Sequence, residues 1–206
     1  MADKLRVAVL ISGRGSNMQA LVEHQREADP PYRIVLVASN VPEARGLVLA
    51  RRFGIDTWAH SHKGIGRAEF DRLLDAELRR RDVETIALAG YMRLLSDEFV
   101  AAWHGRILNI HPSLLPRHKG LDTHRRALLA GDLYAGCSVH LVTGELDDGP
   151  VLAQARIRIG ARDDAESLAR RVLAEEHKLY PRALHQFASE RLAERERSSH
   201  AETPPS

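Results

Sequence analysis

The amino-acid sequence predicts an α/β fold: a Rossmann-like, open and mostly parallel sheet flanked by helices, with an antiparallel C-terminal extension. Three observations lead to this prediction. Apolar runs of strand length recur through the first half of the 206-residue chain. Stretches with the apolar spacing of a helix separate these runs. After Pro116 this alternation ends, and two longer extended stretches follow.

The first half has the order of a parallel sheet with covering helices. Parallel strands are buried on both faces and therefore form continuous apolar runs. The predicted strands are Arg6–Ile11, Arg33–Ala38, Ile55–Ala59, Thr85–Ala89 and Arg106–Ile110. Gly, Pro, Ser or Asp residues bound the helical patterns between them. The predicted helices are Ser16–Ala28, Ala44–Phe53, Arg67–Arg81 and Ser96–Ala102.

The second half is predicted to add two antiparallel strands and two helices. A short helix is expected at Thr123–Ala130, and the strands at Ala135–Val142 and Val151–Ile159. The last helix is expected to begin at a capping pair, Asp163 and Glu166. Its apolar face carries Leu168, Val172, Leu179, Ala183 and Phe187.

These elements form one predicted domain at residues 1–187, with an N-terminal half at 1–104 and a C-terminal half at 105–187. Residues 188–206 are charged and then rich in Ser, Pro and Thr. Such a segment has few apolar side chains to bury, so we expect it to be a flexible tail.

The composition excludes several classes of protein. The chain has 30 Lys and Arg residues against 28 Asp and Glu, a formal net charge of +2, which favours no nucleic-acid partner. The single cysteine, Cys137, excludes an internal disulfide and a cysteine-based zinc site, and it fits a reducing cytoplasm. The apolar run before Gly13 is too short for a signal or membrane helix, so we expect no membrane partner.

A glycine-rich loop, Ser12–Asn17, joins the first strand to the first helix. Its place at the carboxyl end of a parallel strand would let main-chain amides and the helix N-terminus hold a phosphate. The spacing matches neither the dinucleotide fingerprint nor a nucleoside-triphosphate loop, which favours a monophosphate. A tight turn followed by a helix cap at Ser16 or Asn17 would have the same sequence.

A second polar cluster follows the fifth predicted strand. Alternation places Asn109 and His111 on one side of an extended segment, at the edge of the sheet where ligands bind. Acyl transfer to an amine needs a donor for the developing oxyanion and a route for the amine proton, and this pair can contribute to both. A histidine satisfied in a loop and an asparagine that fixes a turn are the alternative interpretation.

Two carboxylates complete the candidate site. Asp147 lies in a polar turn between the last two strands, and from there a carboxylate can raise the pKa of His111 if the turn folds back. Such turns are also common on solvated surfaces. Glu176 lies on the apolar face of the last helix, where a carboxylate needs a partner. That partner is either an arginine of the scaffold or a ligand.

The sequence favours no metal. The chain has 11 histidines, but it has no His-Glu-x-x-His pair and no cysteine cluster. Asparagine, moreover, is a poor ligand for zinc.

Six segments, in this order and at this spacing, resemble the phosphoribosylglycinamide formyltransferases, the small folate-dependent family. They cover nearly the whole chain through Pro181. The run from Asn109 to Pro116, followed by Asp147, is typical of transferases and hydrolases that use formyltetrahydrofolate. Among these enzymes, the glycine-rich loop and the chain length most resemble those of the members that act on a ribonucleotide. The segments are VLISGRGSNMQAL, LAGYMRLLS, GRILNIHPSLLP, GLDTHRRAL, GCSVHLVTGELDDGPVLAQ and EEHKLYP.

The resemblance implies transfer of a formyl group from 10-formyltetrahydrofolate, the co-substrate, to the amine of glycinamide ribonucleotide in de novo purine (IMP) biosynthesis. Asn109 and His111 would polarise the formyl oxygen and stabilise the tetrahedral intermediate. Asp147 would orient His111 and help to move the proton. A cytoplasmic monomer or homodimer without a metal is expected.

The resemblance also implies binding residues for both substrates. The phosphate of the ribonucleotide would lie on Gly15, Ser16 and Asn17, and Glu176 would hold another part of the same substrate. The N-terminal half would be the phosphate-binding half, and the C-terminal half would be the catalytic and folate-binding half. The folate-binding residues would be Arg67, Tyr91, Met92, Arg93 and Leu95.

The chain departs from the family pattern in one loop. Arg117–Gly120 stands where an aromatic residue or a proline is usual, and Asp122 replaces a common histidine. These departures concern the conformation of the loop and ligand affinity more than the type of reaction.

Other functions share some of these features. Methionyl-tRNA formyltransferase has the same Asn, His and Asp segments, but it needs a second, basic domain for RNA. Formyltetrahydrofolate hydrolase uses water as the acceptor and usually carries an N-terminal regulatory domain, whereas this chain begins at its first strand. A formyltransferase for another amine and a phosphate-binding module without turnover are further alternatives.

Overall fold

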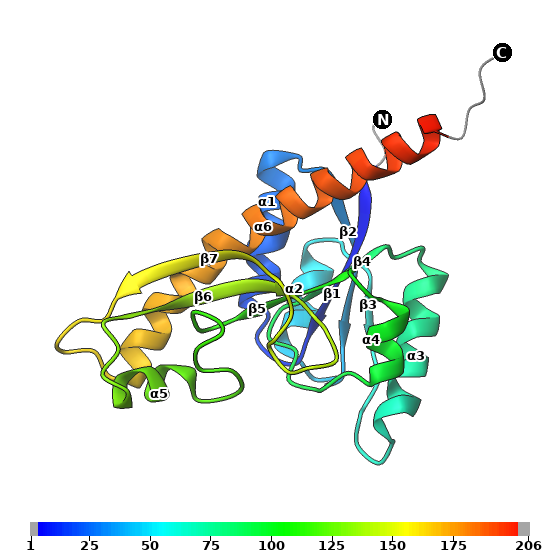
Figure 1. The fold of residues 1–206 in the computed structure, drawn as a ribbon. Helices are drawn as coiled ribbons and strands as arrows, with labels where there is room; N and C mark the ends of the chain where they lie inside the picture. The colour runs from blue at the N-terminus through cyan, green and yellow to red at the C-terminus, as the bar shows by residue number, and fades with distance from the viewer. Residues whose placement is uncertain (1–3, 202–206) are drawn as a thin grey trace.

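The computed structural model describes residues 4–201 of the chain. A seven-stranded sheet in the order β3-β2-β1-β4-β5-β6-β7 forms its centre (Figure 1). The first five strands are parallel, and β6 and β7 join them antiparallel. The predicted fold class is therefore confirmed. The strands are β1 (Leu5–Ile11), β2 (Tyr32–Ser39), β3 (Thr57–Ala59), β4 (Thr85–Leu88), β5 (Ile107–His111), β6 (Tyr134–Leu141) and β7 (Val151–Arg158).

Helices cover both faces of the sheet, which explains the continuous apolar runs. Along β1, Val7, Val9 and Ile11 join one buried cluster with side chains of α1, α2 and α6. Ala8 and Leu10 point to the other face and join the cluster of α3 and α4. The helices are α1 (Ser16–Ala28), α2 (Arg45–Arg52), α3 (Arg67–Arg80), α4 (Asp97–Ala102), α5 (Thr123–Leu129) and α6 (Ala165–Ala201).

The start of α6 differs from its prediction by one residue. Asp163 and Glu166 are not the capping pair. Instead, Asp164 accepts a hydrogen bond from the main-chain N–H of Ser167 at 2.7 Å, and the Ser167 hydroxyl accepts one from the N–H of Asp164 at 2.9 Å. Asp163 pairs with Arg171 in the first turns of the helix. Two adjacent aspartates offered the same capping chemistry, and the helix begins after the second.

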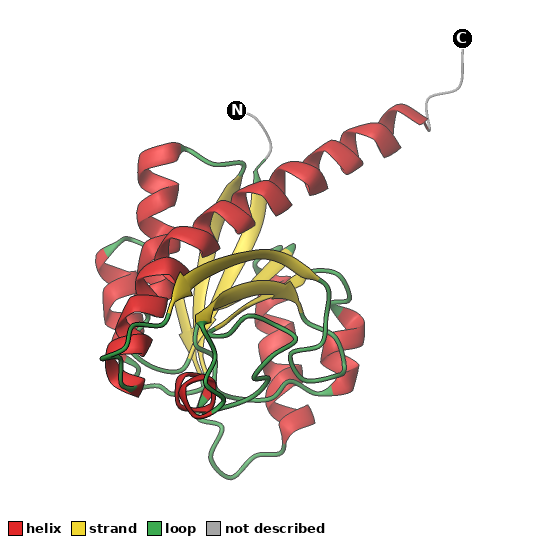
Figure 2. Cartoon of the chain, turned by 60° about the vertical axis from the view of Figure 1, so that its left-hand side comes forward, coloured by secondary structure: helices red, strands yellow, loops and turns green. Residues whose placement is uncertain are grey.

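The prediction of a tail without structure at 188–206 is wrong for most of that segment. Helix α6 continues to Ala201, and its last turns project beyond the sheet (Figure 2). The Ala, Glu and Arg residues of this stretch have high helix propensity, and side-chain pairs along it add to helix stability. Arg195 also pairs with Glu84 of the body. Residues 202–206 lie outside the described part.

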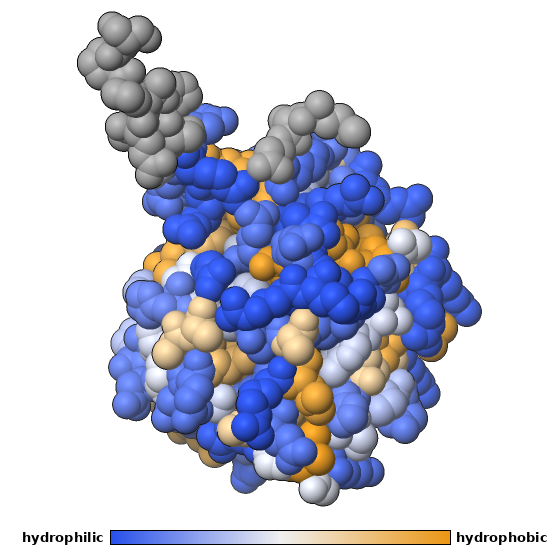
Figure 3. Space-filling model, turned by 90° about the vertical axis from the view of Figure 1, so that its right-hand side faces the viewer, coloured by the Kyte–Doolittle hydropathy of each residue, from blue (hydrophilic) through white to orange (hydrophobic). Residues whose placement is uncertain are grey.

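The surface beside α3 and α4 is mainly hydrophilic and exposes apolar side chains in small separate groups (Figure 3). None of the described helices combines the length and the apolar character needed to cross a bilayer.

Candidate active site

The end of β5 and the adjoining strand β6 carry the centre of the site. β5 extends one residue beyond its predicted end, so it includes both Asn109 and His111. Antiparallel pairing places His140 of β6 directly opposite Asn109. The Asn109 amide nitrogen lies 3.1 Å from His140 Nε2. His111 and His140 are both buried, whereas Asn109 is partly exposed.

Asp147 completes this centre from the turn between β6 and β7. Its Oδ2 lies 3.3 Å from His111 Nδ1, and its Oδ1 lies 3.6 Å from His140 Nε2. The main-chain N–H of Gly120 donates to Oδ2 at 2.9 Å. The structure therefore brings together the three residues that the sequence singled out, and His140 lies between Asn109 and Asp147.

Opposing influences act on the two ionisable groups. Burial alone would raise the pKa of Asp147, but the nearby His140 ring, the hydrogen bond from Gly120 and the charge of His111 outweigh it, so the pKa falls below its ordinary value. Asp147 is therefore a carboxylate at neutral pH. Burial lowers the pKa of His111 below its ordinary value, and the main-chain carbonyl of His118 and the charge of Asp147 offset only part of this effect.

Both ring nitrogens of His111 face acceptors. Nδ1 faces the Asp147 carboxylate, and Nε2 lies 3.1 Å from the carbonyl oxygen of His118. A neutral imidazole carries one N–H and can satisfy one of these acceptors, while the protonated ring satisfies both. The two acceptors favour the protonated ring, whereas burial, the larger influence, favours the neutral one.

The phosphate loop lies at the same edge of the sheet. Gly15 precedes α1 with a φ of +78°, and it has no side chain to cap the first N–H groups of the helix. A Cβ at Gly15 would lie 2.9 Å from Cα of Gly46, so this residue must be glycine. The loop thus leaves the amides of the first turn, including those of Ser16 and Asn17, open to an anion.

Asn17 and Glu176 join α1 to α6 beside this loop. The Asn17 amide donates to Glu176 Oε2 at 2.6 Å, and both side chains are buried. Burial raises the pKa of Glu176, and the hydrogen bond from Asn17 offsets part of this effect. No ion pair between Glu176 and an arginine is found among the described residues. Asn17 Oδ1 is buried without a hydrogen-bond partner.

The segment after β4 carries the residues expected to bind folate. The N–H of Met92 donates to the Ser12 hydroxyl at 2.8 Å, which links this segment to the phosphate loop. Met92 is 69% exposed and is available to a ligand. The Arg93 guanidinium lies over the ring of Phe70, 5.1 Å from its centroid. Leu95 is partly buried.

Asp71 of α3 lies behind that segment. It is buried and accepts a hydrogen bond from the N–H of Ser96 at 2.6 Å. Burial raises its pKa, and Ser96, Arg93 and Arg67 act in the opposite direction. Asp71 Oδ1, the Tyr91 hydroxyl and Arg93 Nε are buried atoms without a hydrogen-bond partner. Such atoms are usually satisfied by water or a ligand. Arg67 is exposed at the start of α3.

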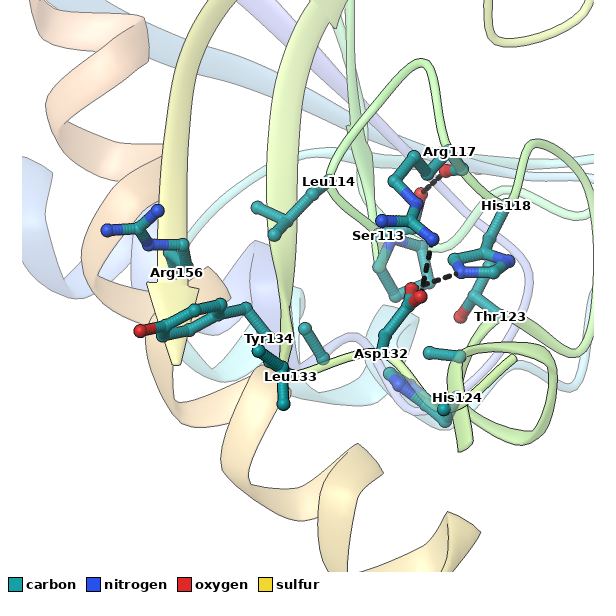
Figure 4. A pocket seen from close by; sticks show the side chains of 14 residues that line it. Ser113, Leu114, Arg117, His118, Thr123, His124, Asp132, Leu133, Tyr134 and Arg156 are labelled. Carbon is teal, nitrogen blue, oxygen red and sulfur yellow. Dashed lines mark hydrogen bonds and ion pairs between the residues drawn. The ribbon is translucent and has the colours of Figure 1, made fainter. Parts of the chain in front are cut away.

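The loop that departs from the family pattern is tied to its surroundings. Arg117 and His118 both bond to Asp132, and Lys119 pairs with Asp148. A pocket of about 450 Å³ lies against the loop, α5 and the first residues of β6. The loop and Asp132 form one side of this pocket (Figure 4).

Sequence reasoning missed four residues of the site. His140 gave no signal of its own, because the pairing that places it opposite Asn109 is set by the register of β6 against β5. Ser12 was noted as part of the loop but not as a link to Met92. Asp71 and Asp132 gave no signal, because their partners lie far along the sequence.

Within residues 4–201, no group of three or more His, Cys, Asp or Glu side chains is arranged to hold a metal ion. The expectation of a metal-free site stays a prediction.

Known proteins are similar to this chain over almost its whole length. Residues 5–184 match the family model described as formyl transferase. Phosphoribosylglycinamide formyltransferase of Escherichia coli (strain K12) is 43% identical over 91% of this chain and 89% of that protein. The trifunctional purine biosynthetic protein adenosine-3 of Gallus gallus is 45% identical over 91% of this chain, which spans 19% of its length. The solved phosphoribosylglycinamide formyltransferase from Brucella melitensis is 50% identical, with a TM-score of 0.85 over 90% of this chain and 96% of that one.

Proposed function

The chain belongs to the formyl transferase family, and from this we infer that it transfers the formyl group of 10-formyltetrahydrofolate to the amine of glycinamide ribonucleotide. Two relatives of similar length are named phosphoribosylglycinamide formyltransferase, which supports the acceptor of the reaction. In this reaction the amine nitrogen bonds to the formyl carbon, and the bond from that carbon to the folate nitrogen breaks. One proton passes from the amine to the folate nitrogen.

A single observation carries the proposal: Asn109, His111 and Asp147 lie together at the same sheet edge as the phosphate loop. Asp147 faces His111 directly, and His140 lies between Asn109 and Asp147. An amide N–H and an imidazole N–H are both donors, and donors fixed in place stabilise an oxygen as negative charge develops on it. Asp147 faces Nδ1 of His111 and orients the ring. Its carboxylate can also accept, through water, the proton that the reacting amine loses, and that proton then passes to the folate nitrogen. These roles follow from the chemistry of the groups and from their mutual distances.

The residues proposed to bind the ribonucleotide suit a phosphate with a polar sugar. The uncapped first turn of α1, preceded by Gly15, offers main-chain donors to the phosphate. Glu176 is a buried carboxylate with an amide partner and no cationic one in the described chain, so its second oxygen can accept from a ligand hydroxyl or amine. Asn17 Oδ1 offers another unused acceptor beside it.

The segment from Tyr91 to Leu95 is proposed to bind the folate. Its main-chain groups and the exposed Met92 side chain lie next to Ser12, so a molecule held there would adjoin the phosphate loop. The unpartnered polar atoms of Tyr91, Arg93 and Asp71 fit a ligand rich in donors and acceptors, either directly or through water. Arg67 is exposed and can meet a negatively charged part of the same ligand.

The proposal is tested by following tetrahydrofolate formation in mixtures of the enzyme and 10-formyltetrahydrofolate, with and without glycinamide ribonucleotide. We expect tetrahydrofolate to form when the ribonucleotide is present and not when it is omitted. Formation at the same rate in both mixtures would indicate a hydrolase. No reaction in either mixture would contradict the proposal, and other amines would then be tested as acceptors.

A further inference from the structure

Asp132 lies between α5 and β6 and binds two consecutive residues of the neighbouring loop. Its side chain is 5% exposed. One oxygen pairs with the Arg117 guanidinium, and the other lies 2.7 Å from His118 Nε2. Figure 4 shows both side chains directed at this carboxylate. A buried carboxylate needs such partners, and their two bonds in turn fix where the loop runs.

His118 links this carboxylate to the candidate catalytic centre. Its side chain bonds to Asp132, while its carbonyl oxygen lies 3.1 Å from His111 Nε2. His118 has a φ of +53°, a left-handed backbone conformation that residues other than glycine adopt at a cost in free energy. The bond to Asp132 stabilises this conformation, and the conformation sets the direction of the carbonyl. On the other side, the Ser113 hydroxyl donates to the carbonyl of Arg117 at 2.6 Å.

The far end of the loop reaches the second partner of His111. The N–H of Gly120 donates to Asp147 Oδ2, the same oxygen that faces His111 Nδ1. The loop at 117–120 therefore contacts the imidazole at Nε2 directly and at Nδ1 through Asp147. A shift of the loop would change both contacts, since only Lys119 separates His118 from Gly120.

We propose that Asp132 is a positioning residue for His111: by holding Arg117 and His118, it fixes the loop whose main-chain groups set the orientation of the imidazole and of Asp147. This role rests on the proposed function of His111. The proposed role also explains one departure from the family pattern, since the histidine at position 118 supplies the ring nitrogen that bonds to Asp132. An aromatic residue without such a nitrogen would leave that carboxylate oxygen to another donor.

The first experiment replaces Asp132 by Asn, which keeps the shape but turns one oxygen into a donor that faces another donor. Two readouts are measured: the titration of the His111 ring by NMR, and kcat and KM for both substrates. We expect His111 to titrate at lower pH, because the carbonyl of His118 helps to hold its proton. We also expect kcat to fall about tenfold, with each KM changed by less than about twofold.

Asp163→Asn is the matched control. Asp163 is also a little-exposed aspartate paired with an arginine, and its partners lie between Gly160 and Arg171. This variant is expected to lower thermal stability without changing kcat or the titration of His111. An equal loss of kcat in both variants would show that Asp132 is part of the scaffold and would overturn the proposal.

A second pair of variants decides the matter if Asp132→Asn does not fold. The Gln and Met side chains of His118→Gln and His118→Met are similar in shape, but only Gln keeps an N–H donor for Asp132. We expect kcat of His118→Gln to exceed that of His118→Met by about threefold or more, since loss of one hydrogen bond is worth about 1 kcal/mol. Equal activity in this pair, or an unchanged His111 titration in the Met variant, would overturn the proposal. The titration needs no turnover, so it tests Asp132 even if the proposed reaction fails.

Discussion

Asp147→Asn is the change that most directly tests how the centre handles its proton. The substitution keeps the shape of the side chain and removes its charge. Unit charges 3.3 Å apart interact by about 5 kcal/mol at an effective dielectric constant of about 20, and by about 2.5 kcal/mol at about 40. Because about 1.4 kcal/mol corresponds to a factor of ten in rate, even the smaller figure predicts a fall in kcat of roughly a hundredfold.

The assay is tetrahydrofolate formation at saturating substrates over a range of pH. Asp147 acts to raise the pKa of His111, so its loss should move the limb of the pH–rate profile that reports His111 to lower pH. Binding of both substrates, measured by calorimetry, should largely survive. An Asp147→Asn enzyme with near-native kcat and an unshifted profile would refute the assignment of Asp147 as the partner of His111.

Three further changes test the binding residues. Gly15→Ala should cost more than about 1–2 kcal/mol of stability, because the left-handed conformation alone costs that much and the Cβ would also crowd Gly46. It should raise KM for the ribonucleotide and not for folate. Glu176→Gln should leave stability without ligand equal or higher at pH 7 and weaken the stabilisation that ribonucleotide provides. Asp71→Asn should raise KM for folate by roughly tenfold, since it removes a buried carboxylate that holds the N–H of Ser96 behind the folate segment.

Each of these changes has a control or a contrary outcome. Gly13→Ala is the control for Gly15, because no atom lies within 4 Å of a Cβ there, and it should be as stable as the wild type. Equal weakening of folate and ribonucleotide by Gly15→Ala would point to a structural turn. A loss of about 3–5 kcal/mol in Glu176→Gln would indicate a scaffold role. For Asp71, a raised KM for ribonucleotide alone would contradict the assignment.

Glu176 also predicts a dependence of stability on pH. Burial raises its pKa above the ordinary value of 4.5, so its favourable contribution to folding is complete below pH 4.5 and is lost as pH rises through the raised pKa. The wild type therefore carries a penalty at neutral pH that Glu176→Gln lacks. The difference in unfolding temperature between the two proteins should shrink as pH is lowered toward 4.5.

The strands of the sheet could be predicted from the sequence because one simple requirement governs their composition. Strands buried on both faces need apolar residues at every position, and β1 meets this need with Val7 to Ile11 in two buried clusters. The order of strands and helices followed from these runs. The prediction for residues 188–206 was wrong because a segment with few apolar residues can still form a helix. Helix propensity and the pair between Arg195 and Glu84 stabilise this one.

The site was predictable where alternation or periodicity placed a residue, and not where a loop conformation did. Asn109 and His111 share one side of β5, and Glu176 faces inward from α6, as their spacing indicates. The contact between His111 and the carbonyl of His118 depends on a left-handed residue in a loop. No periodic pattern encodes such a conformation, and the same holds for the carboxylate of Asp132 that fixes it.

The measurement that tests the proposed reaction most directly follows the formyl carbon itself. The enzyme is mixed with 10-formyltetrahydrofolate labelled with carbon-13 in the formyl group and with glycinamide ribonucleotide, and the label is traced by NMR. We predict one labelled formyl amide on the ribonucleotide for each tetrahydrofolate formed. Label recovered as free formate, or tetrahydrofolate formed without labelled amide, would contradict the assignment of the ribonucleotide amine as the acceptor.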